Sequence, residues 1–343
     1  MRRLVIDLAD RRPLWRVPEW VNARIAARLP AGWEVHVVAA PADGVGDGAQ
    51  RPSAEALEAV ADAEVYFGFG VPAELLRAGR RLRWVHTATA GVSSLLTPEL
   101  VESDIAFTNS AGVHAPAMAE TVIAMMLHFA RGLDIAVRAQ AAGRWTKAPF
   151  DRADAPVREV AGSRTGVVGY GGIGREVARR VTALGGRVIA MRRRPDVQGA
   201  VESGVEVCGP EAFEQLLEAS DYVVLAAPET AETRGLVGAR ELARMKRDAV
   251  LINVARGALV DEAALVDALR SGGIRGAGLD VFAAEPLPEG HPLWALPNVL
   301  ITPHVSAYTH RFWEREAALV EENLARYLAG RPLLNLVDKQ AGY

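Results

Sequence analysis

Short apolar runs alternate with amphipathic stretches along most of the chain, which predicts parallel β-strands joined by helices. In the first third we expect strands at 4–8, 34–40, 64–70 and 83–89, with helices at 18–29 and 53–63. Alternation of this kind is typical of βαβ units and a parallel sheet. The stretch 41–53 is rich in Gly, Asp and Pro, so we expect it to form an exposed loop.

The pattern is sharper from Arg164 onward. Strands are predicted from 164 and at 187–191, 221–228, 249–255, 276–282 and 299–302, and helices at 175–185, 211–220, 238–245 and 261–273. These strands are almost continuously apolar, as strands buried on both faces are. Apolar residues at helical spacing also predict one long helix at 115–143 and a closing helix at 314–330. The fold class is therefore α/β, with doubly wound parallel sheets.

Composition and charge narrow the class of protein. A length of 343 residues suggests two domains at about 150 residues each. The net charge of −3 argues against a general nucleic-acid binder, and the single cysteine, Cys208, excludes an internal disulfide. No apolar run is long enough to span a membrane. Asp7 interrupts the apolar stretch near the start of the chain, which is too short for a signal peptide, so we expect a cytoplasmic protein. The histidines show no zinc-type spacing, and no metal is predicted.

A glycine-rich turn carries the first chemical signal. Gly169, Gly171 and Gly174 fit the pattern G-x-G-x-x-G between an apolar strand and a helix. The first glycine permits the tight turn, and the second lets the backbone approach a pyrophosphate at the start of the helix. The third lets helix and strand pack closely. The turn predicts a dinucleotide site.

The residues after the next strand bear on which dinucleotide binds. An NAD enzyme usually places Asp or Glu there, where it accepts the ribose 2′-hydroxyl. Here the strand runs into Arg192, Arg193 and Arg194, and no acid occurs before Asp196. Arginine suits a 2′-phosphate, so NADP(H) is the predicted cofactor, with NAD(H) possible. The alternative is that the three arginines form a solvated basic turn.

Several motifs coincide with those of one family. The strong match runs from about 165 to 310 and includes VVGYGGIGREVARR, LINVARGALVDEAAL, GAGLDVFAAEPLP and ITPHVSAYT. Weaker matches are TATAGVSSL at 87–95, NSAGVHAPAMAE at 109–120 and the tail VEENLARYLAGRPLLN. The chain resembles the D-isomer-specific 2-hydroxyacid dehydrogenases, which include glyoxylate and hydroxypyruvate reductases.

The resemblance implies three catalytic residues, namely Arg256 in NVARG, Glu285 in DVFAAEP and His304 in TPH. Their chemistry fits hydride transfer to a 2-keto acid, which leaves an alkoxide that needs a proton. Histidine is well placed to give that proton near neutral pH, and a neighbouring carboxylate favours its charged form. An arginine can hold the carboxylate and polarise the keto oxygen.

Further site residues follow from the resemblance only. Ala90, Gly91 and Val92 match the turn whose amides, together with Arg256, hold the substrate carboxylate. The implied cofactor contacts are Gly172 and Ile173 at the pyrophosphate, Arg192 in place of the NAD-type acid, Ala227, Pro228 and Thr233 over the riboses, Val254 and Ala255 beside Arg256, and Asp280 at the nicotinamide carboxamide.

The resemblance also implies the architecture. A flavodoxin-like substrate domain of residues 1–111 and 307–343 would contain an inserted Rossmann-type NAD(P)-binding domain of residues 112–306. A homodimer through the long helix and the loops near 115–160 is implied in the same way. The expected activity is reduction of a small 2-keto acid to the D-2-hydroxy acid, with no nucleic acid or membrane as partner.

Two other functions stay open. One is an NAD-linked dehydrogenase of the phosphoglycerate type. The other is a non-catalytic NAD(P)-binding sensor or corepressor-like scaffold, which would bind the cofactor without turning over any keto acid. The presence of Arg256, Glu285 and His304 together argues against the scaffold.

Overall fold

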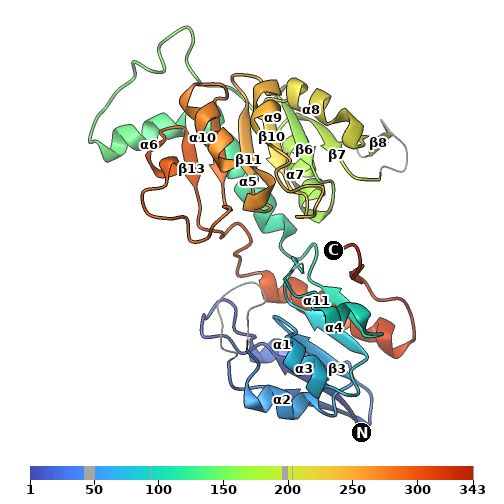
Figure 1. Cartoon of the computed structure of the whole chain (residues 1–343). Helices are drawn as coiled ribbons and strands as arrows, with labels where there is room; N and C mark the ends of the chain where they lie inside the picture. The colour runs from blue at the N-terminus through green and yellow to red at the C-terminus, as the bar shows by residue number, and fades with distance from the viewer. Residues whose placement is uncertain (42–50, 93, 195–199, 203, 343) are drawn as a thin grey trace. The chain divides into compact units, whose positions relative to one another are not determined.

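The computed structural model describes residues 1–41, 51–92, 94–194, 200–202 and 204–342. The chain divides into two compact units (Figure 1), a first unit of Met1–His114 with Thr309–Tyr343 and a second unit of Ala115–Tyr308. Most of the predicted loop at 41–53 lies outside the described residues, as does Asp196. Each unit has its own sheet and its own core.

The first unit is built on a five-stranded parallel sheet with the order β2-β1-β3-β4-β5, which is flavodoxin-like. Its strands are β1 (Arg2–Asp7), β2 (Trp33–Val37), β3 (Val65–Gly68), β4 (Trp84–Thr87) and β5 (Ala106–Asn109). Its helices are α1 (Glu19–Ala26), α2 (Ala54–Val60), α3 (Ala73–Ala78), α4 (Pro98–Glu102) and α11 (Phe312–Leu328).

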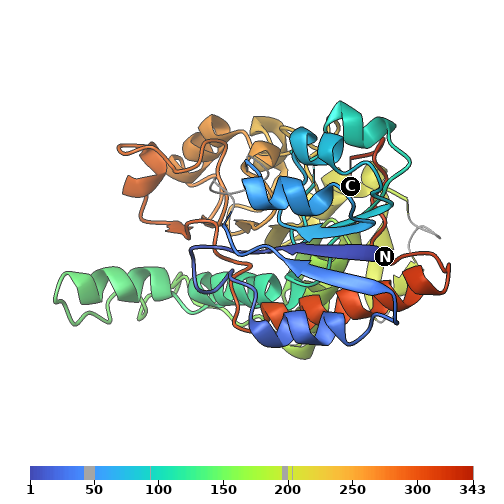
Figure 2. The same ribbon diagram turned by 90° about the horizontal axis from the view of Figure 1, so that it is seen from below.

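Helices cover both faces of this sheet. On one face α1 and α11 bury Ile25, Phe312 and Val320 against the strands, and Figure 2 shows these two helices side by side. On the other face α2, α3 and α4 form a second apolar layer. Helix α11 follows the second unit in the sequence, so the first unit consists of two chain segments that flank the second unit.

The second unit has an eight-stranded sheet with the order β13-β12-β11-β10-β6-β7-β9-β8. Counted from β6, this is the Rossmann order 3-2-1-4-5-6 extended at both edges, and every pair except β8–β9 is parallel. The predicted fold class, a Rossmann-type unit inserted in a flavodoxin-like one, is confirmed.

The second unit's strands are β6 (Arg164–Val168), β7 (Arg187–Met191), β8 (Ala200–Glu202), β9 (Val205–Cys208), β10 (Tyr222–Leu225), β11 (Val250–Asn253), β12 (Gly276–Leu279) and β13 (Val299–Ile301). The helices are α5 (Ala115–Ala130), α6 (Leu133–Ala141), α7 (Gly172–Ala183), α8 (Phe213–Ala219), α9 (Ala239–Arg244) and α10 (Glu262–Arg270), with short 3-10 turns at Pro210–Ala212, Gly257–Leu259 and Pro292–Ala295. The apolar residues of α5 and α7 fill one face of the sheet, and those of α8, α9 and α10 fill the other.

The prediction of one helix over 115–143 is wrong. The chain forms α5 and α6 instead, separated at Gly132, whose φ of 63° lies in the left-handed region. Phe150 lies where a Cβ on Gly132 would be, at 2.7 Å, so the bend also brings the following loop back onto the helix end. Strands β5, β8 and β9 and the short helices α3 and α4 were not predicted. Within the part of the chain that is described, no helix is long and apolar enough to cross a bilayer.

Candidate active site

The second unit gathers its predicted site residues at one edge of its sheet. Strands β6, β7, β10, β11, β12 and β13 run parallel, so their carboxyl ends share one edge, which is where open α/β sheets bind ligands. The segments that follow these strands at this edge are Gly169–Gly174, Arg192–Arg194, Ala227–Pro228, Val254–Arg256, Asp280–Glu285 and Thr302–His304.

The glycine turn leaves helix-start amides for a ligand. Helix α7 begins at Gly172, inside the fingerprint, and its N-cap residue Gly171 provides no side-chain cap. The first amides of a helix have no partner within it and favour an anion. Nothing lies within 4 Å of a Cβ built on Gly171, so the backbone is open to a close approach there. These features fit the pyrophosphate of a dinucleotide.

Two alanine substitutions in this turn are expected to fail in different ways. At Gly174 a Cβ would lie 2.1 Å from the Gly169 carbonyl oxygen, so Gly174→Ala should destabilise the fold. Gly171→Ala meets no protein atom and should keep the melting temperature, but its methyl group should raise the NADPH Kd at least about tenfold. Thermal unfolding and NADPH fluorescence titration check both variants. Unchanged NADPH binding in Gly171→Ala would contradict the assignment.

The structure brings His304 and Glu285 together. His304 Nδ1 lies 2.7 Å from Glu285 Oε2, and Glu285 Oε1 accepts from the backbone N–H of Phe282 at 2.9 Å. Both side chains are partly exposed, at 37% and 35%. The carboxylate therefore fixes the orientation of the ring and leaves Nε2 pointing away from it, without a bond to any described residue.

Asp280 holds the turn that carries His304. His304 has a φ of 53°, a left-handed conformation that costs free energy in a non-glycine residue. Asp280 is fully buried, and its Oδ1 accepts from the Thr302 hydroxyl at 2.6 Å and the Val305 N–H at 2.9 Å. Its Oδ2 accepts from the Ser306 N–H at 3.0 Å. The contacts of Asp280 thus keep the strained turn in place, whereas its contact with a nicotinamide stays a prediction.

Arg256 sits on a second clamped turn. The Asn253 side chain is buried, donates to the Arg256 carbonyl oxygen at 2.9 Å and accepts from the Ala255 N–H at 3.0 Å. A Cβ on Gly257 would lie 1.9 Å from the Phe282 carbonyl carbon, so only glycine fits after Arg256. The half-buried guanidinium donates to the Ala255 carbonyl oxygen at 2.7 Å, which leaves most of its donors for a ligand.

The remaining predicted cofactor residues lie on neighbouring loops. The Thr233 hydroxyl donates to the Pro228 carbonyl oxygen at 2.7 Å, which closes the loop after β10. Arg193 forms an ion pair at 3.6 Å with Glu232 of that same loop. Arg192 is half-buried at the end of β7, and Arg194 is exposed. The basic run therefore flanks the loop predicted to cover the riboses.

In the first unit, the loop Ala88–Val92 after β4 orients its peptide groups. The carbonyls of Thr89, Ala90 and Gly91 accept from the Ser110 N–H at 3.0 Å, the Asn109 side chain at 2.8 Å and the Thr89 hydroxyl at 3.2 Å. The N–H groups of Ala90, Gly91 and Val92 bond to no described residue. With the carbonyls occupied, these three amides remain available to an anion, and we call them the anion cradle.

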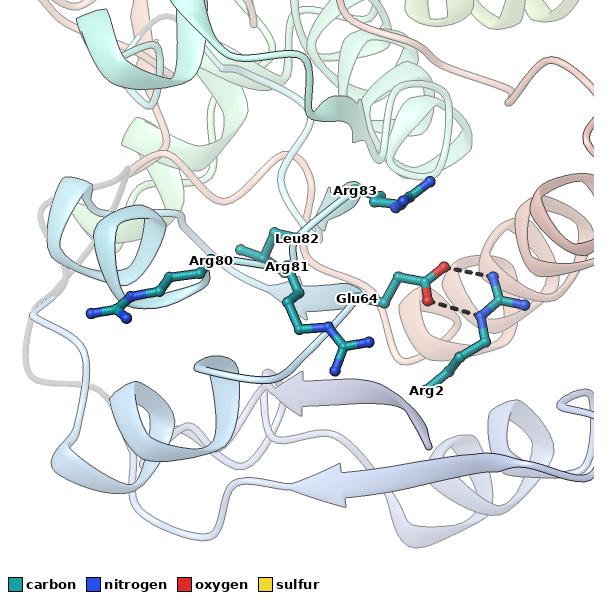
Figure 3. A pocket seen from close by; sticks show the side chains of 6 residues that line it. All are labelled: Arg2, Glu64, Arg80, Arg81, Leu82 and Arg83. Atoms are coloured by element: carbon teal, nitrogen blue, oxygen red, sulfur yellow. Dashed lines mark hydrogen bonds and ion pairs between the residues drawn. The ribbon is translucent and has the colours of Figure 1, made fainter.

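One hollow in the first unit is not part of this arrangement. It measures about 540 Å3 and is lined by Arg2, Glu64, Arg80, Arg81, Leu82 and Arg83 (Figure 3). Arg2 opens β1 and Arg83 precedes β4, so the hollow lies at the amino edge of the sheet, opposite Ala88–Val92. Arg2 bonds both oxygens of Glu64 at 2.8 and 2.5 Å, which lowers the pKa of that carboxyl group. Arg80 and Arg81 follow the end of α3, where cations stabilise a helix.

Among the described residues no group of three or more His, Cys, Asp or Glu side chains could hold a metal ion. The carboxyl edge of the second unit instead offers helix-start amides for a dinucleotide, a carboxylate-oriented imidazole and an arginine on a clamped turn. These parts together define a nicotinamide-dependent oxidoreductase.

Comparisons with known proteins identify the family. A family model described as the NAD-binding domain of D-isomer specific 2-hydroxyacid dehydrogenases matches residues 123–306. Glyoxylate reductase from Korarchaeum cryptofilum is 38% identical over 272 residues, which cover 79% of this chain and 80% of that protein. The chain belongs to the D-isomer specific 2-hydroxyacid dehydrogenase family, and it is an enzyme with a nicotinamide-binding domain.

Solved structures agree with this placement. A D-isomer specific 2-hydroxyacid dehydrogenase from Xanthobacter autotrophicus Py2, in complex with NADPH and MES, has a TM-score of 0.80 at 34% identity and covers 100% of this chain and 99% of its own. The NADPH-dependent glyoxylate/hydroxypyruvate reductase from Sinorhizobium meliloti, in complex with NADP and sulfate, has a TM-score of 0.78 at 29% identity and covers both chains fully. The chain spans about half the length, 49 to 53%, of the D-3-phosphoglycerate dehydrogenases that it also matches.

Sequence reasoning did not find the residues that hold these turns. Asn253, Asn109 and Ser110 act through contacts that only the fold creates, although Asn253 stands inside the quoted motif. Asn253 and Asn109 are the last residues of β11 and β5, and Ser110 follows β5, so the local pattern of the sequence did not mark them.

Proposed function

We propose that this enzyme reduces a small 2-keto acid to the D-2-hydroxy acid with NADPH as hydride donor. The observation that carries the proposal is the 2.7 Å contact between His304 and Glu285 on a turn clamped by Asp280. An imidazole held by a carboxylate at one nitrogen can deliver a proton from the other. Glyoxylate and hydroxypyruvate are the proposed substrates, since relatives are named as reductases of these acids.

Each residue has a separate role in the proposed mechanism. In the first unit, the amides of Ala90, Gly91 and Val92 are the groups proposed to bind the substrate carboxylate. In the second unit, Arg256 is the residue proposed to polarise the keto oxygen on which negative charge develops. A nicotinamide cofactor bound at the carboxyl edge would supply the hydride. His304 gives its Nε2 proton to the new alkoxide oxygen, and Glu285 stabilises the charged ring before that transfer.

The proposed cofactor contacts lie on segments at the carboxyl edge of the second unit. The amides of Gly172, Ile173 and Gly174 at the start of α7 would hold the pyrophosphate. The loop with Ala227, Pro228 and Thr233 would cover the riboses, and Val254, Ala255 and Asp280 would lie beside the nicotinamide. The residues 1–111 and 307–343 would then act as the substrate domain, with 112–306 as the cofactor domain.

The arginines after β7 would set the cofactor preference. An Arg192 guanidinium can bind a ribose 2′-phosphate bidentately, whereas the NAD ribose offers only a hydroxyl. We expect Arg192→Asp to lower kcat/KM for NADPH at least about 30-fold and to raise it for NADH, because the new carboxylate accepts from that hydroxyl. The measurement is steady-state oxidation of each cofactor at saturating glyoxylate. An unchanged NADPH preference in Arg192→Asp would refute the role of this residue.

The proposal extends to assembly and location. Leu133 and Val137 on α6 and Trp145 in the following loop are exposed, with Trp145 at 93%. Exposed apolar side chains on one projecting segment suit burial against a second copy, so the proposed state is a homodimer through residues 115–160. The cytoplasm, where the NADPH pool is kept reduced, is the proposed location.

A further inference from the structure

A buried polar cluster joins α11, which we call the tail helix, to the carboxyl ends of β4 and β5. Glu316 on α11 and His86 on β4 are both buried, at 0% and 1% exposure, and Glu316 Oε1 lies 2.9 Å from His86 Nε2. The Ser110 hydroxyl lies 2.9 Å from the same oxygen. The other ring nitrogen, His86 Nδ1, lies 2.7 Å from the Thr108 hydroxyl, which also accepts from Trp84 Nε1 at 2.8 Å.

Stability alone does not account for this cluster. Taking a carboxylate out of water is costly, and a packed apolar pair of similar volume is often as stable as a buried ionisable pair. Here the second oxygen of Glu316 is buried without a hydrogen-bond partner among the described residues. The cluster keeps a costly group in the core, and its contacts hold neighbouring segments in place.

Ser110 connects Glu316 with the loop that carries the anion cradle. Besides Glu316, the Ser110 hydroxyl lies 3.0 Å from the Thr87 carbonyl oxygen at the end of β4. Its backbone N–H donates to the Thr89 carbonyl oxygen at 3.0 Å, and the preceding Asn109 donates to that of Ala90 at 2.8 Å. Two consecutive residues thus hold the carbonyl side of the loop Ala88–Val92. Because the C=O and the N–H of a peptide group point in opposite directions, the N–H groups of Ala90–Val92 then point away from Asn109 and Ser110.

The tail helix is anchored at the same place by two further contacts. Arg315 donates to the Val113 carbonyl oxygen at 3.3 Å, and the Phe312 ring stacks on His114 at 5.0 Å. The segment Ser110–His114 is therefore fixed to the start of α11 along its length. Ser110 is the member of this segment that reaches both the tail helix and the loop after β4.

We propose that Ser110, held by Glu316 of α11, is a positioning residue for the loop Ala88–Val92, whose amides are the proposed carboxylate site, and that Ser110 thereby sets the affinity for the keto acid. The kinetic part of this inference rests on the proposed function. Loss of the Ser110 hydroxyl removes its contacts with Glu316 and the Thr87 carbonyl, which hold the Ser110 backbone whose N–H bonds the Thr89 carbonyl, so binding must then order the loop. Arg256, Glu285 and His304 are untouched, so KM for the keto acid should rise while kcat stays the same.

The chain offers a matched control for Ser110→Ala. Ser103 precedes β5, whereas Ser110 follows it, and the Ser103 hydroxyl donates to the Leu100 carbonyl oxygen at 2.8 Å. Ser103→Ala therefore removes a similar bond at the opposite end of the same strand. Glu316→Gln is the conservative variant, because it keeps an acceptor oxygen for Ser110 and His86.

The experiment compares Ser110→Ala, Ser103→Ala and Glu316→Gln in the full-length protein. We expect Ser110→Ala to raise KM for glyoxylate about tenfold, with kcat and the NADPH Kd within twofold of wild type. Amide exchange at residue 110, whose N–H bonds to the Thr89 carbonyl, should become faster in this variant only. Ser103→Ala and Glu316→Gln should keep KM within twofold.

Equal KM values and equal exchange rates in Ser110→Ala and Ser103→Ala would overturn the proposal. So would a KM in Glu316→Gln as high as in Ser110→Ala, because the acceptor oxygen is still present there. If the wild-type protein reduces no 2-keto acid, the proposed function fails separately. The exchange rate at residue 110 then still decides whether this cluster positions the loop.

Discussion

Replacing His304 with asparagine is expected to lower kcat by about 10³-fold, because a general acid contributes roughly 10² to 10⁴ to such a step. Asparagine is the right replacement because it tolerates the left-handed backbone of this residue, with its φ of 53°. The turn should therefore stay intact, held by the Asp280 carboxylate. Steady-state NADPH oxidation with glyoxylate measures kcat, and fluorescence titration measures the NADPH Kd.

The control for this variant is Glu285→Gln. It keeps one acceptor oxygen, for either the Phe282 N–H or the ring, and removes the charge that stabilises the imidazolium. A smaller loss, about tenfold, is expected. His304→Asn should bind NADPH within twofold of wild type. If it retained more than about a tenth of the wild-type kcat, another group would have to donate the proton.

Replacing Arg256 with lysine is expected to lower kcat/KM for the keto acid by about 10³-fold. Lysine keeps the charge but loses the planar fork that holds carboxylate and keto oxygen together. Two charge-assisted hydrogen bonds at roughly 1.5–3 kcal/mol each, with about 1.4 kcal/mol per tenfold, give this magnitude. The turn should survive, because Asn253 holds the backbone carbonyl of Arg256.

Arg240→Lys is the matched control for Arg256→Lys. Arg240 is exposed and pairs with Glu241 at 2.8 Å on α9, so its replacement should leave kcat/KM unchanged. Both kcat and KM should worsen in Arg256→Lys, since the guanidinium acts on bound substrate and on the transition state. A change in KM alone would assign Arg256 to carboxylate binding only.

The sheet edge at which the proposed catalytic residues Arg256 and His304 lie could be predicted because each of them closely follows an apolar strand. Parallel strands bring their carboxyl ends to one edge, so Arg256 and His304, 48 positions apart by number, reach the same edge of the sheet. The motifs around Arg256 and His304 indicated which residues at this edge were candidates for catalysis. The hydrogen bonds that hold their turns were not predictable. The contacts of Asp280 with Thr302 and Ser306, for example, depend on a turn that only the folded chain forms.

The errors in predicting the fold also arise because the local sequence pattern does not show the tertiary contacts. Residues 115–143 show apolar positions at helical spacing throughout, and only Gly132 marks the break between α5 and α6. Strand β5 was missed because it is four residues long and ends in Thr108 and Asn109. Both are polar, and their side chains bond Trp84 and the Ala90 carbonyl. A buried polar residue with a tertiary partner has no signature in the local pattern.

The two rival functions make different predictions for one assay. An NAD-linked dehydrogenase of the phosphoglycerate type would oxidise NADH at least as well as NADPH and prefer a phosphorylated substrate. A non-catalytic sensor or scaffold would bind either cofactor without turnover. Neither rival needs a carboxylate-oriented imidazole together with a basic run after β7, which are the two features on which our proposal depends.

The most direct measurement is oxidation of NADPH and NADH at 340 nm by the purified protein with glyoxylate, hydroxypyruvate, pyruvate and larger 2-keto acids. We expect turnover of a short 2-keto acid, with kcat/KM for NADPH well above that for NADH. Binding of both cofactors without reduction of any of these acids would contradict it.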